Sequence, residues 1–308
     1  MFELDKLCLH EHIKFTKDFL YSIYLYEPGF DKILTPICAY QDPETLIYEK
    51  LLKPISLYEL YNRNDFEYSA SEKFAEGFTL KEILEIIYNI SLALKHCHDR
   101  GILLNNLSFD TIIFENQDLS SLKIMDFHEA FLIEHKQDFI DKVDLNNIDP
   151  HIINSLEKIL LRNRDDDHRY HSKEENSRLA MKSPEFMMQK DLGPDPQNHY
   201  KSDIWSVGII FHFFLVGVHH YEILLNRELE DISRYDVAAY LKEKEKVDEF
   251  DTDADNYKHI PESFKDLLKM CLNFDVEKRA TIDEVLQKIK EIQKINIEDI
   301  ICNKNLDC

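Results

Sequence analysis

The feature that most restricts the fold and chemistry of this chain is its scarcity of glycine. Only six of the 308 residues are glycine, and the closest pair, Gly208 and Gly217, lies nine positions apart. The loops that cradle phosphate groups, G-x-G-x-x-G and G-x-x-x-x-G-K, need glycines much closer together. The sequence therefore excludes both loops, and any phosphate chemistry in this chain has to proceed without a glycine cradle.

The charge balance is strongly acidic. The 37 lysines and arginines are outnumbered by 59 aspartates and glutamates, which gives a formal net charge of −22. Nucleic acids and anionic membranes are polyanions that bind basic surfaces. We therefore expect no nucleic-acid partner and no membrane partner, and basic or apolar protein surfaces become the expected partners.

Cysteine usage and hydropathy favour an intracellular protein. The six cysteines form no C-x-x-C pair, so neither a zinc site nor a disulfide framework is indicated. The longest apolar stretch, residues 204–218, contains His212 and is shorter than the roughly 20 residues that span a bilayer. We expect a cytoplasmic location and leave association with an organelle or the cytoskeleton open.

Periodicity and end signals predict a mixed α+β chain. Thr79 with Glu82, and Thr281 with Glu284, have the spacing of capping boxes, which mark the starts of helices. Ser56 with Glu59 has the same spacing and predicts a short helix. The remaining predicted elements share apolar periodicity or turn signals: a helix at 12–26, strands at 33–40, 45–49, 112–114 and 122–125, and helices at 150–160, 201–216, 231–244 and 261–272.

Five ordered strings then resemble the protein kinase family. Residues 98–112, H-D-R-G-I-L-L-N-N-L-S-F-D-T-I, look like its catalytic loop, and K-I-M-D-F-H at 123–128 stands in place of D-F-G. S-P-E at 183–185 corresponds to A-P-E. The other two strings are S-D-I-W-S-V-G at 202–208 and D-V-E-K-R-A-T at 275–281.

The resemblance implies a two-lobed kinase-like fold with a reduced N-terminal lobe, built from a helix and short antiparallel strands, and a mainly helical C-terminal lobe. We assign residues 1–53 to the N-lobe remnant and 54–308 to the C-lobe, with a long insertion in the activation segment at about 129–180. Only about ten residues precede the first helix, too few for the three strands that bring the family's lysine. A short lobe and a gene model that begins late both fit this length.

Four positions match the structural framework of the family. The resemblance implies an ion pair between Glu185 and Arg279, which is costly to break singly when buried. It also implies that Asp203 holds the backbone of the catalytic loop and that Trp205 fills the lower core. A plain charge at a helix N-terminus is the alternative interpretation of Asp203.

The positions that carry chemistry in the family are replaced here. Asn106 stands at the base aspartate, and its amide cannot accept a proton. Ser108 replaces the lysine that neutralises the transferred phosphate, Thr111 replaces the asparagine ligand of the second magnesium, and His128 replaces the D-F-G glycine. Asp126 is the one metal ligand kept, and one carboxylate is a poor magnesium site. We therefore expect no catalytic residues, no cofactor and no metal.

These replacements predict a pseudokinase: an inactive, kinase-like scaffold or structural subunit of a larger complex, and not an enzyme. Its protein partners would cover the reduced N-lobe, the segment 126–185 or the loop 62–77. One alternative is an active or residual ATP-dependent serine/threonine phosphotransferase that relies on Asp126, with His128 or Asp110. A further alternative is an ATP-binding sensor without turnover.

Overall fold

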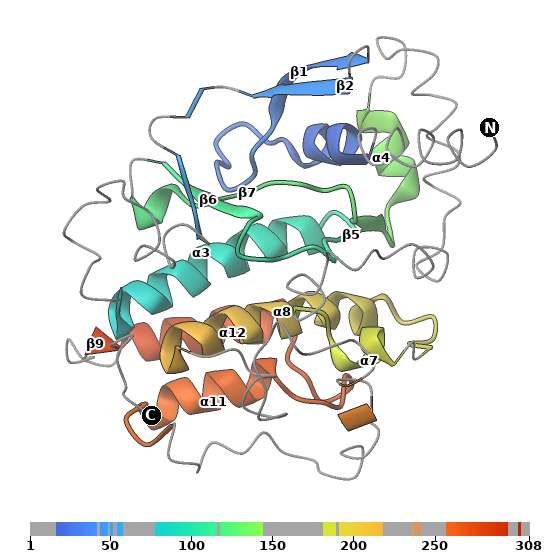
Figure 1. The fold of residues 1–308 in the computed structure, drawn as a ribbon. Helices are drawn as coiled ribbons and strands as arrows, with labels where there is room; N and C mark the ends of the chain where they lie inside the picture. The colour runs from blue at the N-terminus through green and yellow to red at the C-terminus, as the bar shows by residue number, and fades with distance from the viewer. Residues whose placement is uncertain are drawn as a thin grey trace.

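A computed structural model provides the structure of the chain. It describes residues 17–41, 44–48, 50–51, 54–57, 78–115, 118–143, 181–188, 191–217, 236, 239–240, 257–294 and 301–302. Figure 1 shows short strands and the N-terminal helix on one side of a long central helix, and a group of helices on the other side. The fold is kinase-like and mixed α+β, with few strands in its reduced N-terminal part.

The N-terminal part combines a helix and a hairpin. Residues 17–25 are helical, and β1 (Pro36–Gln41) pairs antiparallel with β2 (Glu44–Tyr48). The Asp-Pro turn signal between two apolar runs is typical of such a hairpin, and the predicted pairing is confirmed. The 17–25 helix buries Tyr21 and Tyr24 against Phe139, with ring centroids 5.6 and 4.9 Å apart.

A three-stranded sheet lies between this helix and the central helix. Its order is β3 (Ile55–Ser56), β6 (Ile112–Phe114), β7 (Lys123–Ile124), and both pairings are antiparallel. The predicted hairpin of β6 and β7 is confirmed. Leu57, directly after Ser56, is helical, and the rest of the short helix predicted from Ser56 and Glu59 falls outside the described residues.

The central helix, α3 (Leu80–His98), begins as its capping box predicts. Thr79 Oγ1 accepts from the Glu82 backbone N–H at 3.2 Å, and the Glu82 carboxylate accepts from the Thr79 N–H at 3.0 Å. One face buries Ile83, Ile87 and Ile90 completely. The chain turns at Gly101, whose φ of 76° suits glycine. It then enters β5 (Ile102–Leu103), which pairs with β8 (Phe131–Leu132).

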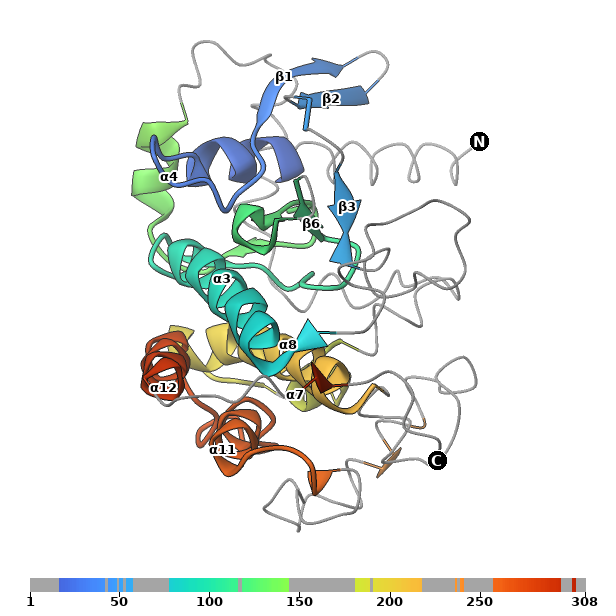
Figure 2. The same ribbon diagram turned by 90° about the vertical axis from the view of Figure 1, so that its left-hand side faces the viewer.

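The C-terminal helices pack below α3 (Figure 2). Helix α8 (Pro196–Val216) is buried along most of its length and packs against α3 and α11 (Glu262–Cys271), while α12 (Ile282–Gln293) packs against α3 and α11. Helix α8 begins before the predicted residue 201, because Asp195 caps it and Pro196 occupies its first position. The Thr281 capping box of α12 is confirmed.

Shorter elements complete the described chain. They are η2 (Leu119–Ser121), α4 (Lys136–Lys142), α7 (Pro184–Met187) and the pair β4 (Phe78–Thr79) with β9 (Ile301–Cys302). No helix within the described ranges has the length and apolar character needed to cross a membrane. The helix predicted at 150–160, the expected contact loop 62–77 and most of the segment 126–185 fall outside the described residues. Most of the predicted helix at 231–244 also falls outside them.

Candidate functional site

Asp203 anchors the loop that resembles the family's catalytic loop. It lies on α8, is 1% exposed, and accepts hydrogen bonds from the backbone N–H groups of Leu104 (2.9 Å) and Asn105 (2.8 Å). His98 Nε2, at the end of α3, donates to the same carboxylate at 2.9 Å. One buried carboxylate therefore ties the loop to both long helices.

The loop is closed from within by Thr111. Its Oγ1 donates to the Asn106 carbonyl at 3.0 Å and accepts from the Ser108 backbone N–H at 3.0 Å. Ser108 is 4% exposed, and its Oγ has no hydrogen-bond partner among the described residues. Asp110, in contrast, is exposed. Thr111 thus holds the loop's shape, and Asp110 points away from the buried part of the loop.

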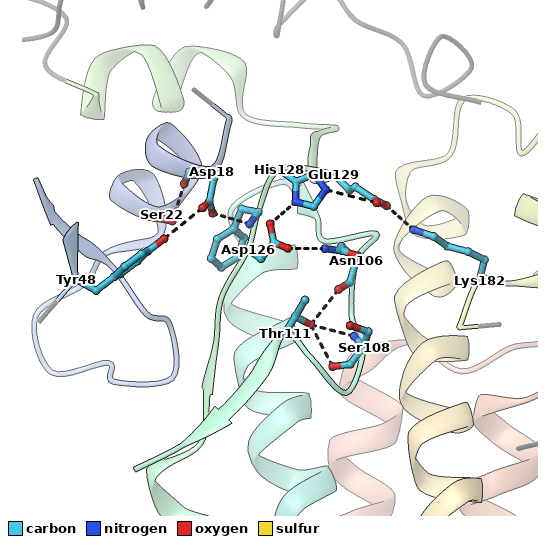
Figure 3. Close-up of polar contacts among 11 residues, drawn as sticks. Asp18, Ser22, Tyr48, Asn106, Ser108, Thr111, Asp126, His128, Glu129 and Lys182 are labelled. Carbon is cyan, nitrogen blue, oxygen red and sulfur yellow. Dashed lines mark hydrogen bonds and ion pairs between the residues drawn. The ribbon is translucent and has the colours of Figure 1, made fainter. Parts of the chain in front are cut away.

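Asn106 and Asp126 meet across two loops (Figure 3). The Asn106 side-chain amide donates to Asp126 Oδ2 at 3.2 Å, while His128 Nδ1 donates to Oδ1 of the same carboxylate. About a quarter of the Asp126 side chain is exposed, compared with 13% of His128. The structure therefore brings together three of the residues singled out from the sequence, and Asp126 is the most accessible of them.

Both loops contain backbone strain where they approach each other. Asn105 and Asp126 have φ values of 57° and 68°, in the left-handed region that glycine normally occupies. Such conformations cost on the order of 1–3 kcal/mol each and cluster at functional sites. The left-handed backbone conformation thus occurs at Asp126 and not at His128, the residue that replaces the D-F-G glycine.

Two further charged residues, which the sequence did not single out, extend the site. Lys182 Nζ lies 2.6 Å from Glu129 Oε2, and Glu129 Oε1 lies 3.6 Å from His128 Nε2. Burial alone lowers the pKa of His128, but its bonds to Asp126 and Glu129 outweigh burial and raise the pKa to about 9. Burial alone raises the pKa of Glu129, but Lys182 and His128 hold it well below its usual range. His128 and Glu129 therefore both carry a charge at neutral pH.

Asp18, on the 17–25 helix, approaches the site from the other side. It accepts from the Phe127 backbone N–H at 2.7 Å and from Tyr48 Oη at 3.2 Å. Burial is the main cause that raises its pKa to about 6. The partners of that carboxylate lie 30 and 109 residues away in the chain, so no local sequence pattern links them.

The framework residues lie beneath the site. Arg279 Nη1 and Nη2 lie 2.7 and 2.9 Å from the two oxygens of Glu185, and both side chains are almost completely buried. Burial alone raises the pKa of Glu185, but Arg279 outweighs it and lowers the pKa to about 2. The Trp205 ring lies 5.4 Å from Phe274 and 5.1 Å from the Arg279 guanidinium. These contacts join α7 and α8 to the loop before α12.

The donor set does not fit the two magnesium ions that the family resemblance implies. His128 and Asn106 already occupy the two oxygens of Asp126, and the Thr111 hydroxyl is used within its own loop. Across the described part of the chain, no three acidic, histidine or cysteine side chains gather as a metal site. The positive charge beside Asp126 comes instead from His128.

The fold and loop geometry are similar to those of protein kinases, and comparisons with known proteins agree with this similarity. A model of the protein kinase domain matches residues 168–289. Calcium-dependent protein kinase 5 of Plasmodium falciparum (isolate 3D7) is 24% identical over 278 residues, which cover 86% of this chain and 40% of the relative. MAP kinase-activated protein kinase 5 of Homo sapiens is 25% identical over 218 residues, 68% of this chain and 38% of the relative. The chain thus spans less than half the length of these relatives.

Solved structures show the same fold. A twitchin kinase fragment of C. elegans, an autoregulated protein kinase with immunoglobulin domains, aligns with a TM-score of 0.59 and 16% identity, covering 91% of this chain and 49% of that one. A longer twitchin kinase region aligns with a TM-score of 0.55 and 18% identity, covering 85% of this chain and 36% of that one. Over the aligned residues the chain therefore has the fold of these kinases.

These relatives correct one expectation. The prediction that the protein is not an enzyme is wrong, because the relatives that align with most of the chain are named as protein kinases. The physical reason is that positioning and electrostatics carry most of phosphoryl transfer. A missing general base lowers the rate by about 10² to 10⁴ and leaves the other contributions in place.

Proposed function

We propose that the protein is an ATP-dependent phosphotransferase that transfers phosphate slowly to serine or threonine hydroxyl groups. The observation that carries this proposal is the site at Asp126. Two strained loops bring this partly exposed carboxylate against Asn106 and His128, at sequence positions that correspond to the reacting positions of the kinase family. Relatives named as protein kinases support the same activity.

The described side chains suit positioning better than proton transfer. Asn106 donates to Asp126 and thereby fixes the direction in which the carboxylate faces the substrate. His128, with its raised pKa, balances the charge of Asp126. The amide of Asn106 does not take up the proton of an acceptor hydroxyl. We therefore expect a rate lower by about 10² to 10⁴ than that of an enzyme with a base at this position.

The test is transfer of label from γ-labelled ATP, supplied as its magnesium or manganese complex, to a library of serine and threonine peptides. We expect slow transfer by the wild type, and loss of transfer in Asp126→Asn. Asp31→Asn is the matched control, because Asp31 is an exposed aspartate outside the site. Transfer that survives in Asp126→Asn, or fails in the wild type, contradicts the proposal.

Thermal melting with ATP separates the remaining alternative. A ligand at concentration c that binds only the folded state stabilises it by RT ln(1 + c/Kd), so the melting temperature rises with the logarithm of the ATP concentration above Kd. Melting that rises with ATP while no label is transferred supports a nucleotide sensor without turnover. Binding of protein partners, as a scaffold or structural subunit, stays a prediction that is compatible with the proposed activity.

A further inference from the structure

Lys182 connects the end of the activation segment to the catalytic-type loop. It directly precedes Ser183 and α7, where Glu185 is fixed by Arg279. Its side chain is 6% exposed, and its ammonium group donates to the Asn105 carbonyl and to Glu129 Oε2, the latter at 2.6 Å. A single cation therefore joins three segments that are far apart in the sequence.

The bond to Asn105 acts on a residue with strained backbone. The N–H of Asn105 donates to Asp203 at 2.8 Å, and its carbonyl accepts from Lys182. Asp203 and Lys182 thus hold the two peptide groups of a residue whose φ is 57°. Because Asn106 follows directly, the orientation of its side chain depends on both contacts.

The bond to Glu129 acts on Asp126 through a row of alternating charges. In Figure 3 dashed lines join Lys182, Glu129, His128 and Asp126 in turn, and Asn106 lies below this row, joined to Asp126. Each step is a contact between opposite charges or a hydrogen bond to the next side chain. Charge-assisted hydrogen bonds of this kind are the stronger ones in proteins. Lys182 is therefore connected to Asp126 through Glu129 and His128, and to Asn106 through the neighbouring Asn105 carbonyl.

We propose that Lys182 is a positioning residue that sets Asn106 and Asp126 for the reaction, so that the segment needs no added phosphate to hold the site together. Within this site the loop offers the Asn105 carbonyl, and the segment itself supplies the cation, Lys182. This inference rests on the proposed phosphotransferase function. The positive charge thus lies on the segment, at Lys182, and is present without any modification of the chain.

The first test measures amide hydrogen exchange, which does not depend on activity. In Lys182→Met we expect exchange at residues 104–108 and 126–130 to increase about tenfold, with α11 and α12 unchanged. Lys182→Arg is expected to restore most of the protection. Lys290→Met, at an exposed lysine of α12, is the matched control and is expected to change neither segment. Unchanged exchange in the two loop segments of Lys182→Met overturns the proposal.

A milder variant keeps the test decisive if Lys182→Met fails to fold. Glu129→Gln keeps an oxygen acceptor but removes the charge beside Lys182. We expect faster exchange at 126–130 and little change at 104–108, because the bond of Lys182 to Asn105 remains. Equal effects on both segments, or an effect on neither, contradict the two separate routes.

Kinetics and phosphatase treatment provide the functional readout. A displaced reacting group lowers kcat on the order of 10²-fold, so we expect this loss in Lys182→Met with KM for ATP nearly unchanged. Treatment of the wild type with a broad-specificity phosphatase is expected to leave both kcat and exchange unchanged. A loss of loop protection after phosphatase treatment overturns the inference. Absence of transfer in the wild type refutes the proposed function, while the exchange experiment still decides the role of Lys182.

Discussion

The carboxylate of Asp18 accepts a 2.7 Å hydrogen bond from the backbone N–H of Phe127, which lies 109 residues further along the chain. This bond joins the N-terminal helix to the stretch that carries Asp126. The pKa of Asp18, about 6, lies above the ordinary value of 3.8, mainly because the carboxylate is buried. The helix is therefore attached to the site by a group whose ionisation is costly.

This shift predicts a defined pH dependence of stability. The folded state binds the Asp18 proton more tightly than the unfolded state, so its contribution to stability is complete below about pH 4 and is lost as the pH rises through 6. Relative to Asp18→Asn, the free energy of unfolding of the wild type should fall by on the order of 2–3 kcal/mol between pH 4 and 7. Urea unfolding at each pH measures this difference.

Tyr48→Phe provides the companion variant. The hydrogen bond from Tyr48 lowers the pKa of Asp18, so its removal should raise that pKa and move the pH dependence to higher pH. If the free energies of unfolding of the wild type and Asp18→Asn change with pH in parallel, burial does not raise the pKa of Asp18.

The Glu185–Arg279 pair predicts a large loss of stability when one partner is removed. Glu185→Gln or Arg279→Met should each lower the free energy of unfolding by about 3–5 kcal/mol, because the remaining group is left buried without its partner. The double variant should lose less free energy of unfolding than the two single variants added together. The more exposed pair Lys288–Asp266, at 3.0 Å, is the comparison, and its removal should cost about 0.2–1 kcal/mol. Similar losses at both pairs would contradict this reasoning.

Gly208 predicts a steric effect at the contact of α8 with α11. A Cβ atom at this position would lie 2.6 Å from Leu272 Cδ2 and 2.8 Å from Cys271 Cβ. Gly208→Ala should therefore lower the free energy of unfolding by about 1–3 kcal/mol. Leu272→Ala should remove the clash with Leu272 and leave the contact with Cys271, so the double variant should lose less free energy of unfolding than the two single variants added together. If the two losses, measured by denaturant unfolding, are strictly additive, then a Cβ at position 208 does not clash with Leu272.

The features that the sequence predicted are those with local signals. Capping boxes at Thr79 and Thr281 require residues only three positions apart, and Asp42-Pro43 falls in the sequence between the paired strands β1 and β2, so these elements follow from short patterns. Helix α4 was missed because His135 at its start is left-handed and provides no side-chain cap. The Asp195-Pro196 start of α8 was a readable signal that was overlooked.

The site was only partly predictable. Five strings that resemble the family located Asn106, Ser108, Thr111, Asp126 and His128, but the string positions do not show which contacts replace the lost ones. Lys182 and Glu129 lie 53 residues apart, so their ion pair has no local signature. From the sequence, Lys182 directly before the S-P-E string and Glu129 directly after D-F-H look like ordinary surface residues. Only the folded chain makes them neighbours.

The rate of phosphate transfer by Asn106→Asp, relative to the wild type, tests the central claim most directly. A carboxylate at this position restores a proton acceptor beside Asp126, and general bases contribute about 10² to 10⁴ in rate. We predict that kcat with γ-labelled ATP rises by at least about 10²-fold while KM for ATP changes little. Absence of transfer by both proteins, with both folded by thermal melting, would contradict the claim that this chain is a slow phosphotransferase.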